Sequence, residues 1–238
     1  MSRLNEFGQP IGDALPDGWT PPPLPSRMTL AGRVVKIVPM DAEAHGAALY
    51  EAFKLDETDA GWTYMANGPY SCLADFMTWL KTAAVATDPM LFSFLNAQSG
   101  QPVGYGALMR IDARMACIEV GNLRMSPLQQ RTPMSTEAIH LLADYAFKLG
   151  YRRFEWKCDS LNAPSRTAAE RLGFTYEGTF RNAMHYKGRS RDTAWFSITE
   201  DEWPAIREAQ QAWLAPDNFD QNGIQKQRLA ELIQQARG

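Results

Sequence analysis

The sequence predicts a mixed α/β domain whose twisted sheet is largely antiparallel and flanked by helices. Three observations lead to this prediction. Segments with strand-like and helix-like apolar spacing occur in the order β-α-α-β-β-β-α-β-α-β-β. Several strand-like runs follow one another with only a short turn between them, which favours antiparallel pairing. The 238 residues have an ordinary globular composition, 45% hydrophobic and 21% charged.

The first segment of the chain is rich in proline. Six of the fifteen prolines fall within the first 25 residues. Because proline fixes φ and cannot donate to a sheet, residues 1–27 are expected to form an extended arm. Its apolar Phe7, Leu15, Trp19 and Leu24 indicate that the arm lies along the domain and packs on it. A recognition segment for proline-binding modules is the alternative interpretation.

The domain itself is expected over residues 28–215, and it begins with one strand and two helices. The run from Arg33 to Val38 is rich in β-branched residues, which favour a strand. Asp41 can cap an Ala-rich helix that extends to about residue 55. After a loop, apolar residues at helical spacing predict a second helix over 71–86.

Turn residues separate the elements that follow. Ser99-Gly100 and Asp112-Ala113 are typical of hairpin turns, and Gly150 and Gly173 suit positions just after a helix. These turns delimit three strands at 91–97, 102–111 and 115–125, a helix at 134–149, a strand at 152–158, a helix at 163–172, two strands at 174–186 and 191–198, and a helix near 200–215.

The tail, residues 216–238, has the spacing of one more amphipathic helix. Ile224, Leu229, Leu232 and Ile233 are expected to share its apolar face. Such a face suits packing on the domain or a contact between subunits, so a homodimer remains one open interpretation.

Charge and cysteine content limit the classes of function. The chain has 24 Lys and Arg against 27 Asp and Glu, a net charge of −3, which does not suggest nucleic-acid binding. It lacks an apolar run of the roughly 20 residues that cross a membrane, and its first residues lack a secretory signal. The three cysteines, Cys72, Cys117 and Cys158, suit a reducing compartment. We expect a soluble, cytoplasmic protein without membrane association.

The most informative segment runs from Leu123 to Ala138, where a strand leaves the sheet, turns and starts a helix. Thr132 can act as the N-cap and Pro133 suits the first helical position. The free amides of the first helical turn could then hold an anion such as a phosphate. The residues expected to do so are Arg131, Met134, Ser135 and Thr136. An ordinary capped helix is the alternative.

Glu119 is unusual because it stands in an otherwise apolar strand. An ionised carboxylate there needs a partner or a channel to water. One interpretation is a general base whose pKa is raised by its surroundings. The other is a structural ion pair with Arg110 or Arg124.

Two motifs resemble the GCN5-related N-acetyltransferase (GNAT) superfamily, specifically the branch of ribosomal-protein N-acetyltransferases. The first is Met125-Ser126-Pro127 followed by the loop that starts at Gln130, although Pro133 and Ser135 replace the two glycines of the family loop. The second is Asn162-Ala163-Pro164-Ser165 ahead of Leu172-Gly173-Phe174. The likeness covers about residues 28–215. Asn162 could also simply cap the next helix through the Ser165 amide.

The resemblance implies an enzyme that transfers an acetyl group from acetyl-CoA, as co-substrate, to a primary amine of a small molecule or protein N-terminus. It implies Glu119 as the base, the Met125 N–H as the oxyanion donor and Ser165 as an acid. It implies coenzyme A contacts at Leu123, Met125, Gln130, Arg131, Thr132, Met134, Ser135, Thr136, Asn162 and Ser165. It implies an acceptor pocket around Trp62 and Tyr64; a plain hydrophobic clamp is the alternative for these aromatic residues. Independently of the resemblance, His185 is a weaker candidate for acid or base chemistry at the substrate, and a structural role on its strand is the alternative.

No cluster of His, Cys and carboxylate residues has the spacing of a metal site, so no metal is expected. Two other functions remain open. The missing loop glycines would suit a non-catalytic acyl-CoA-binding or regulatory module. The proline-rich arm and the apolar tail would suit an interaction protein.

Overall fold

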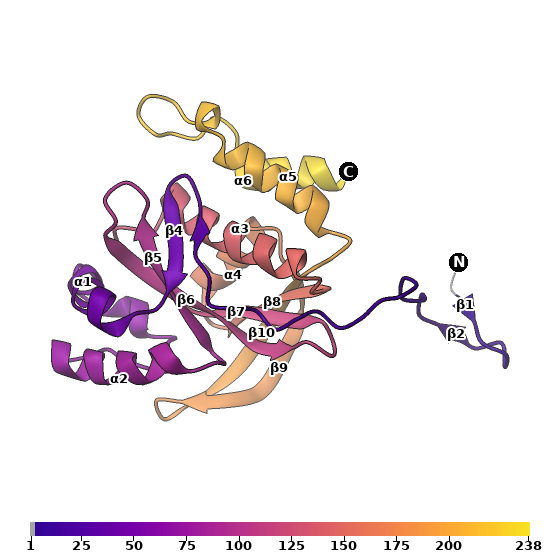
Figure 1. Ribbon diagram of the computed structural model, residues 1–238, viewed down its shortest axis with the longest axis horizontal. Coiled ribbons are helices and arrows are strands. Elements are labelled where there is room, and N and C mark those ends of the chain that lie inside the picture. Colours follow the sequence, from indigo (N-terminus) through magenta and orange to yellow (C-terminus); the bar gives the residue numbers. More distant parts are fainter. Residues whose placement is uncertain (1–2) are drawn as a thin grey trace.

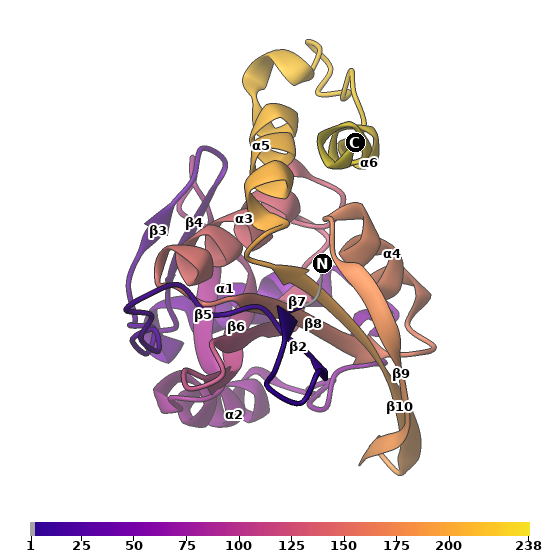
Figure 2. The ribbon, with the colours of Figure 1, turned by 90° about the vertical axis from the view of Figure 1, so that its right-hand side faces the viewer.

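An eight-stranded twisted sheet forms the centre of the computed structural model, which describes residues 3–238 (Figures 1 and 2). Its strand order is β3 (Leu30–Ala31), β4 (Val35–Pro39), β5 (Met90–Asn96), β6 (Pro102–Asp112), β7 (Cys117–Met125), β8 (Arg153–Asp159), β10 (Arg189–Thr199) and β9 (Thr175–Tyr186). All neighbouring strands are antiparallel except β7 and β8, which are parallel. The predicted fold class is therefore confirmed.

Helices cover both faces of the sheet. On one face lie α1 (Ala42–Lys54) and α2 (Leu73–Val85), joined by a loop with the short 3₁₀ helix η1 (Ala60–Trp62); on the other lie α3 (Pro133–Lys148) and α4 (Ala163–Arg171). Asp41 caps α1 by accepting the N–H groups of Glu43 and Ala44, as predicted. Within residues 3–238, every helix is too short or too polar to cross a membrane.

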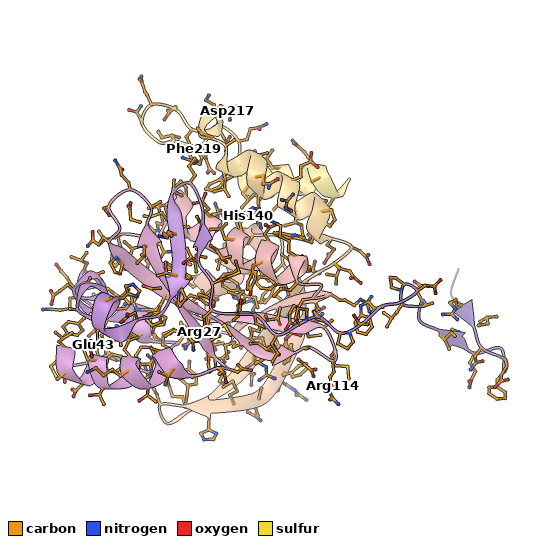
Figure 3. The ribbon with its side chains drawn as sticks, in the orientation of Figure 1. Arg27, Glu43, Arg114, His140, Asp217 and Phe219 are labelled. Carbon is orange, nitrogen blue, oxygen red and sulfur yellow. The ribbon has the colours of Figure 1, made fainter. Side chains whose placement is uncertain are left out.

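Two further helices complete the C-terminal part of the chain. They are α5 (Trp203–Leu214) and α6 (Leu229–Arg237), separated by the 3₁₀ helix η2 (Pro216–Asn218). Leu229 and Ile233 of α6 are buried in the same core as α3 and α5. His140, labelled on α3 in Figure 3, forms a hydrogen bond through Nδ1 with Gln210 Oε1 of α5 at 2.9 Å. Ile224 precedes α6 and is 62% exposed, so its predicted place on the helix face is wrong.

A buried carboxylate fixes the start of α3 against the sheet. Glu137 accepts the backbone N–H groups of Arg33 at 2.9 Å, Val34 at 2.7 Å and Val35 at 2.8 Å, in the turn between β3 and β4. Three backbone donors satisfy a carboxylate that is only 5% exposed. The N-terminus of α3 is thereby held in one position relative to the central strands.

The proline-rich arm departs from its prediction. Residues 3–18 project away from the domain instead of lying along it (Figure 1), and Phe7 is 76% exposed. Within the arm, β1 (Arg3–Leu4) and β2 (Pro10–Ile11) form a hairpin of their own. The arm contacts the domain through Pro22 and Pro25, which are buried. The stiff proline segment carries the residues that precede them away from the domain.

The feature that positions a site is the parting of the two parallel strands. β7 and β8 pair only over Cys117–Val120 and Arg153–Trp156. Beyond these residues β7 continues to Met125 and β8 to Asp159 without pairing to each other. A gap therefore opens in the middle of the sheet, and α3 and α4 both start near its mouth.

Candidate active site

Met125 turns its peptide groups toward the gap. Met125 and Gly104 face each other without exchanging hydrogen bonds, because Ser126 N–H donates to Val103 O at 3.0 Å. In an antiparallel ladder, a residue of such a pair directs both its N–H and its C=O away from the neighbouring strand. The Met125 N–H therefore points away from β6, to the side where β8 has parted from β7.

The Met125 carbonyl is held by two side chains. Arg124 Nη1 donates to it at 3.0 Å and Gln130 Nε2 donates at 2.8 Å. Leu123 is half-buried, and because the Arg124 N–H of the next peptide faces β6, the Leu123 carbonyl points away from β6. The strand bulges just before it, at Asn122. Three predicted coenzyme A contacts, Leu123, Met125 and Gln130, thus lie together along one edge of the gap.

The loop into α3 offers fewer free amides than predicted. Thr132 occupies the N-cap position, but its hydroxyl donates to Gln129 O at 2.7 Å and leaves the helix uncapped. Ser135 N–H donates to Thr132 O at 3.2 Å, so the prediction that this amide is free is wrong. Met134 occupies the second helical position, where the N–H has no acceptor within its own helix. Thr136 is buried and accepts from Arg171 Nη1 at 3.0 Å.

Asn162 and Ser165 lie on the opposite side of the gap. Asn162 Oδ1 accepts the Ser165 N–H at 3.1 Å, which confirms the predicted cap of α4 and leaves the Asn162 amide nitrogen for another partner. Ser165 Oγ accepts from Trp156 Nε1 of β8 at 3.0 Å. Ser165 is therefore fixed on the face of the sheet that α4 covers.

Glu119 lies in a buried network of charges on the other face. It is 5% exposed, and its Oε2 is 3.1 Å from Lys157 Nζ and 3.4 Å from Arg110 Nε. Lys157 also reaches Glu155 Oε2 at 2.6 Å and lies 3.5 Å from the centre of the Trp195 ring. Burial raises the pKa of Glu119, and the charge of Lys157 opposes this rise.

Only one of the two arginines expected to pair with Glu119 does so. Arg110 is an ion-pair partner, whereas Arg124 is directed elsewhere. Because Trp156 and Lys157 are neighbours on a strand, they point to opposite faces. Ser165, bonded to Trp156, and Glu119, paired with Lys157, therefore flank the gap from its two faces.

Arg124 is clamped beneath the loop between α1 and α2. Its side chain is 2% exposed, and Nη2 bonds Asp56 Oδ2 at 3.0 Å. Its guanidinium carbon lies 4.6 Å from the centre of the Trp62 ring and 5.0 Å from that of Phe53. Gly61 packs so closely on the guanidinium that a Cβ there would collide with it. The α1–α2 loop, residues 55–72, is thereby anchored to β7 beside Met125.

The α1–α2 loop also bridges the two sides of the gap. Three hydrogen bonds make this bridge: from Tyr64 Oη to Leu161 O at 3.1 Å, from Lys187 Nζ to Trp62 O at 2.8 Å, and from Arg189 Nη2 to Thr63 O at 2.7 Å. The loop therefore contacts the start of α4 and the turn between β9 and β10.

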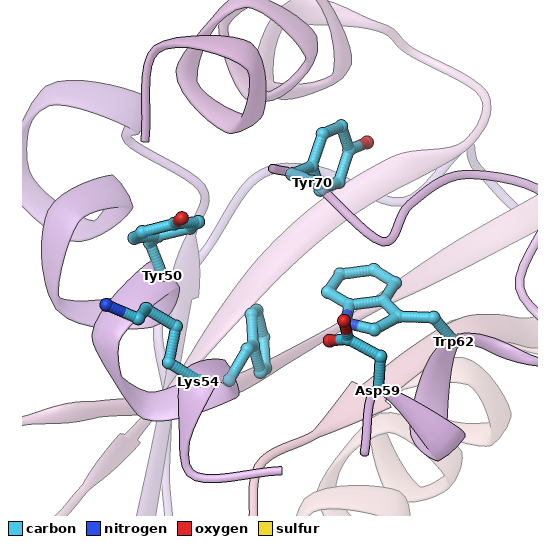
Figure 4. A pocket seen from close by; sticks show the side chains of 6 residues that line it. Tyr50, Lys54, Asp59, Trp62 and Tyr70 are labelled. Carbon is cyan, nitrogen blue, oxygen red and sulfur yellow. The ribbon is translucent and has the colours of Figure 1, made fainter. Parts of the chain in front are cut away.

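Trp62 belongs to an aromatic cluster rather than to an open pocket. It is 4% exposed and meets Phe53 and Tyr70 edge to face. The hollow beside it, lined also by Tyr50, Lys54 and Asp59, encloses about 20 Å³ (Figure 4). That space holds one water-sized group, so for Trp62 the geometry favours the hydrophobic clamp. Tyr64 is half-buried beside the gap.

His185 is exposed near the tip of the β9–β10 hairpin. Its neighbour Tyr186 points inward, where its hydroxyl donates to Asp159 Oδ2 at 2.8 Å. Because side chains alternate along a strand, His185 points to the opposite face. His185 therefore lies on the face of the hairpin opposite to the Tyr186–Asp159 bond.

Comparison with known proteins assigns the chain to a family. A model described as an acetyltransferase (GNAT) domain matches residues 35–175. A GCN5-related N-acetyltransferase from Brucella melitensis is 45% identical, with a TM-score of 0.89, over 91% of this chain and 99% of that one. The chain belongs to the GNAT family.

Other solved structures support the assignment. A structure described as a probable acetyltransferase of the GNAT family from Chromobacterium violaceum is 38% identical over 82% of this chain and 99% of that one, with a TM-score of 0.75. Mycobacterium smegmatis RimJ in complex with CoA-disulfide shares the fold, with a TM-score of 0.64 at 19% identity over 78% of this chain and 94% of that one. The protein is thus an acetyl-CoA-dependent N-acetyltransferase, and the predicted family is confirmed.

The loop of this GNAT enzyme accommodates the loss of both family glycines. Pro133 and Ser135 lie inside α3, where the backbone is helical and glycine is not required. The left-handed residue of the turn is instead Arg131, with φ of 60°, a conformation that costs a non-glycine residue about 1–2 kcal/mol. Arg131 is exposed, so its guanidinium is accessible at the start of the helix.

Sequence reasoning missed the two cations that organise this GNAT site. Arg124 was expected beside Glu119, and Lys157 was not singled out. Lys157 stands in the strand Arg153–Asp159 in alternation with Arg153, Glu155 and Asp159, so charge recurs at every second position. That period-two pattern is the signal that could have identified a polar face on β8.

Proposed function

We propose that this enzyme acetylates a primary amine by direct attack on acetyl-CoA within the β7–β8 gap. The observation that carries the proposal is the Met125 N–H, which points away from β6 where the strands part. Acyl transfer needs a fixed donor at the place where negative charge develops on the carbonyl oxygen. A backbone N–H on a sheet strand is such a donor, and the two side chains on the Met125 carbonyl restrict its motion.

The residues around the gap fit a coenzyme A molecule. Leu123 and Met125 offer peptide groups for the pantetheine arm, and the amide nitrogen of Asn162 is available from the other side. Met134 N–H and the exposed Arg131 guanidinium supply positive charge for the pyrophosphate at the start of α3. Gln130, Thr132, Ser135 and Thr136 shape this turn through their hydrogen bonds.

Glu119 is the proposed base, and Ser165 the proposed acid at the departing thiolate. An amine is protonated at neutral pH and must lose a proton before it attacks. Glu119 Oε1 lies beside Gly121, where pairing with β8 has ended, so its carboxylate is at the mouth of the gap. A water molecule would carry the proton from the amine to Glu119. The opposite placement of Ser165 suits a leaving group that departs toward α4.

An assay with acetyl-CoA and a panel of small amines and peptides tests this function. We expect release of free thiol together with an acetylated amine identified by mass spectrometry. Glu119→Gln should lower kcat by a factor of about 100 or more and leave acetyl-CoA affinity unchanged in calorimetry. Glu51→Gln, on the exposed surface of α1, is the matched control and should retain full activity. An unchanged kcat for Glu119→Gln would exclude the proposed base.

Two further outcomes would contradict the proposal itself. Tight binding of acetyl-CoA without thiol release against the whole panel would favour a non-catalytic acyl-CoA-binding module. Hydrogen exchange measured with and without CoA shows which backbone amides the ligand protects. Protection confined to segments other than β7 and α3 would place the ligand elsewhere.

A further inference from the structure

We propose that the projecting arm, residues 3–18, docks on the β9–β10 hairpin of a second copy of this chain, and that the exchange is reciprocal. The proposal concerns assembly and is independent of the reaction. It rests on two surfaces within one chain, an exposed apolar arm and an unpaired strand edge, that carry charges of opposite sign.

Residues 3–18 of the arm expose apolar side chains that their own domain does not cover. Its hydrogen bonds are local, such as Gln9 N–H to Asn5 Oδ1 at 2.9 Å and the β1–β2 pairing of Arg3 with Ile11. Leu4 is 62% exposed and Phe7 is 76% exposed. Apolar side chains ordered on a small hairpin but left in water gain free energy by docking on another surface.

Proline gives the arm a reach beyond its own domain. Residues 12–21 join the arm hairpin to the anchored segment and could span at most roughly 30 Å. A turn closed by the Trp19 N–H, which donates to Pro16 O at 3.0 Å, shortens this reach. Pro16 and Pro21–Pro23 stiffen this connection, and the anchor is set by the Ser26 N–H, which donates to Tyr145 Oη of α3 at 2.8 Å. A stiff connection that leaves the domain outward disfavours folding back and favours contact with a neighbour.

The β9–β10 hairpin presents the complementary surface. β9 is the last strand of the sheet, so one edge of its backbone is unpaired over Thr175–Tyr186. Phe180 is 57% exposed and Met184 is 49% exposed along this strand. A shallow hollow of about 720 Å³ lies beside Phe180, Arg181, Asn182 and Ala183. Exposed strand edges of this kind pair readily with another extended segment.

Charge favours the arm as the occupant of that surface. The arm contains the acidic residues Glu6, Asp13 and Asp17 against the single basic Arg3. The hairpin carries the opposite sign: residues 178–192 include Arg181, Lys187, Arg189 and Arg191 against the single acidic Asp192. Two surfaces of the same charge would repel each other on contact, whereas the acidic arm and the basic hairpin attract each other, which also favours one relative orientation.

Two-fold symmetry doubles the contact. If the arm of each copy lies on the hairpin of the other, the same pair of patches is used twice, which is the arrangement of an isologous dimer. A stable dimer of this kind buries about 800 Å² per partner. In this arrangement each copy contributes two contacts, one through its arm and one through its hairpin.

Molecular mass in solution tests the exchange, with light scattering after size-exclusion chromatography of the full chain. We expect the full chain at the mass of a dimer and a variant lacking residues 3–18 at the mass of a monomer. The deletion leaves the domain intact because the arm bonds only locally, and an unchanged unfolding transition of the remaining domain checks this. Arg181→Glu should weaken dimerisation by about tenfold or more through charge repulsion.

Two comparisons make the test specific. Lys226→Glu makes the same change of charge at an exposed residue of the α5–α6 loop and should leave the dimer intact. Combining Arg181→Glu with Asp13→Arg and Asp17→Arg should restore it. A monomeric full chain at tens of micromolar, or a deletion variant that remains dimeric, would overturn the proposal. Thiol release with acetyl-CoA is measured separately, so failure of the dimer does not bear on the proposed reaction.

Discussion

Strand β7 buries charge at two places, around Arg124 and around Glu119, and the two clusters are built differently. Arg124 has one acidic partner, Asp56, and is otherwise enclosed by the Trp62 and Phe53 rings. Glu119 faces two basic groups, Arg110 and Lys157, and shares Lys157 with a second carboxylate. The first cluster is a closed pair under the α1–α2 loop, and the second is a buried network across β7 and β8 just before these strands part.

The pKa shifts of the two carboxylates go in opposite directions. Burial acts to raise the pKa of Asp56, but the Gly61 N–H bond and the charge of Arg124 outweigh it, and the pKa is lowered. Burial dominates at Glu119, and the pKa is raised. The pair at Arg124 therefore stays ionised at neutral pH and fixes a loop, whereas burial shifts the Glu119 carboxyl toward its protonated form. The two clusters on β7 thus shift the pKa values of their carboxyl groups in opposite directions.

Breaking the closed pair should have the largest effect on stability. Arg124→Met leaves Asp56 without its counter-charge and removes one donor from the Met125 carbonyl. We expect the free energy of unfolding, measured with urea, to fall by about 3–5 kcal/mol. Lys81→Met, which breaks the exposed pair with Glu43, should cost less than about 1 kcal/mol.

A second variant separates the lost pair from lost packing. Arg124→Met combined with Asp56→Asn removes both charges, so part of the lost stability should return.

The lowered pKa of Asp56 also sets the sign of the pH dependence of stability. Its contribution is present above the ordinary carboxyl pKa and is lost as the pH falls through the lowered value. An equal loss for Arg124→Met at pH 7 and at pH 2 would show that the ion pair is not the cause.

Much of the architecture could be predicted because its determinants are local. Asp41 and Asn162 precede their helices directly, so the caps follow from short-range sequence. The pair of Arg124 and Asp56 joins residues 68 positions apart and depends on how the α1–α2 loop folds over β7. The pairing of Glu119 with Lys157 depends on the parallel register that places Glu119 beside Glu155. Neither follows from the spacing of residues along one segment.

The arm shows a different limit of sequence reasoning. Proline content predicted an extended segment, and residues 3–18 are extended apart from their small hairpin. Apolar Phe7 and Leu15 suggested packing on the same domain, but composition does not say which molecule an apolar residue contacts. For the same reason the candidate site was predicted as a set of residues, without the faces on which they lie.

The proposed base, Glu119, should respond to the loss of Lys157. Lys157→Met removes the cation that opposes the effect of burial on Glu119, so the pKa of Glu119 rises further. A base must be ionised to act, so the acidic limb of the kcat/KM profile should move to higher pH. We expect activity roughly tenfold lower at acidic pH and nearly normal at pH 9. Lys226→Met, at an exposed position, should leave the profile in place. A uniform loss at every pH would indicate a structural role for Lys157 instead.

The smallest expected effect concerns the bridge across the gap. Tyr64→Phe removes one hydroxyl, which donates to Leu161 O at 3.1 Å, and keeps the ring. The free energy of unfolding should change by about 1 kcal/mol or less, because one partly exposed hydrogen bond is lost. If the α1–α2 loop defines the acceptor side, the KM for the amine should rise a few-fold while the KM for acetyl-CoA stays constant. Thr63→Ala, whose side chain is exposed while its carbonyl still accepts from Arg189, is the matched control. Equal changes in both KM values would place Tyr64 on the coenzyme side of the gap, and the α1–α2 loop would then act through Arg124 alone.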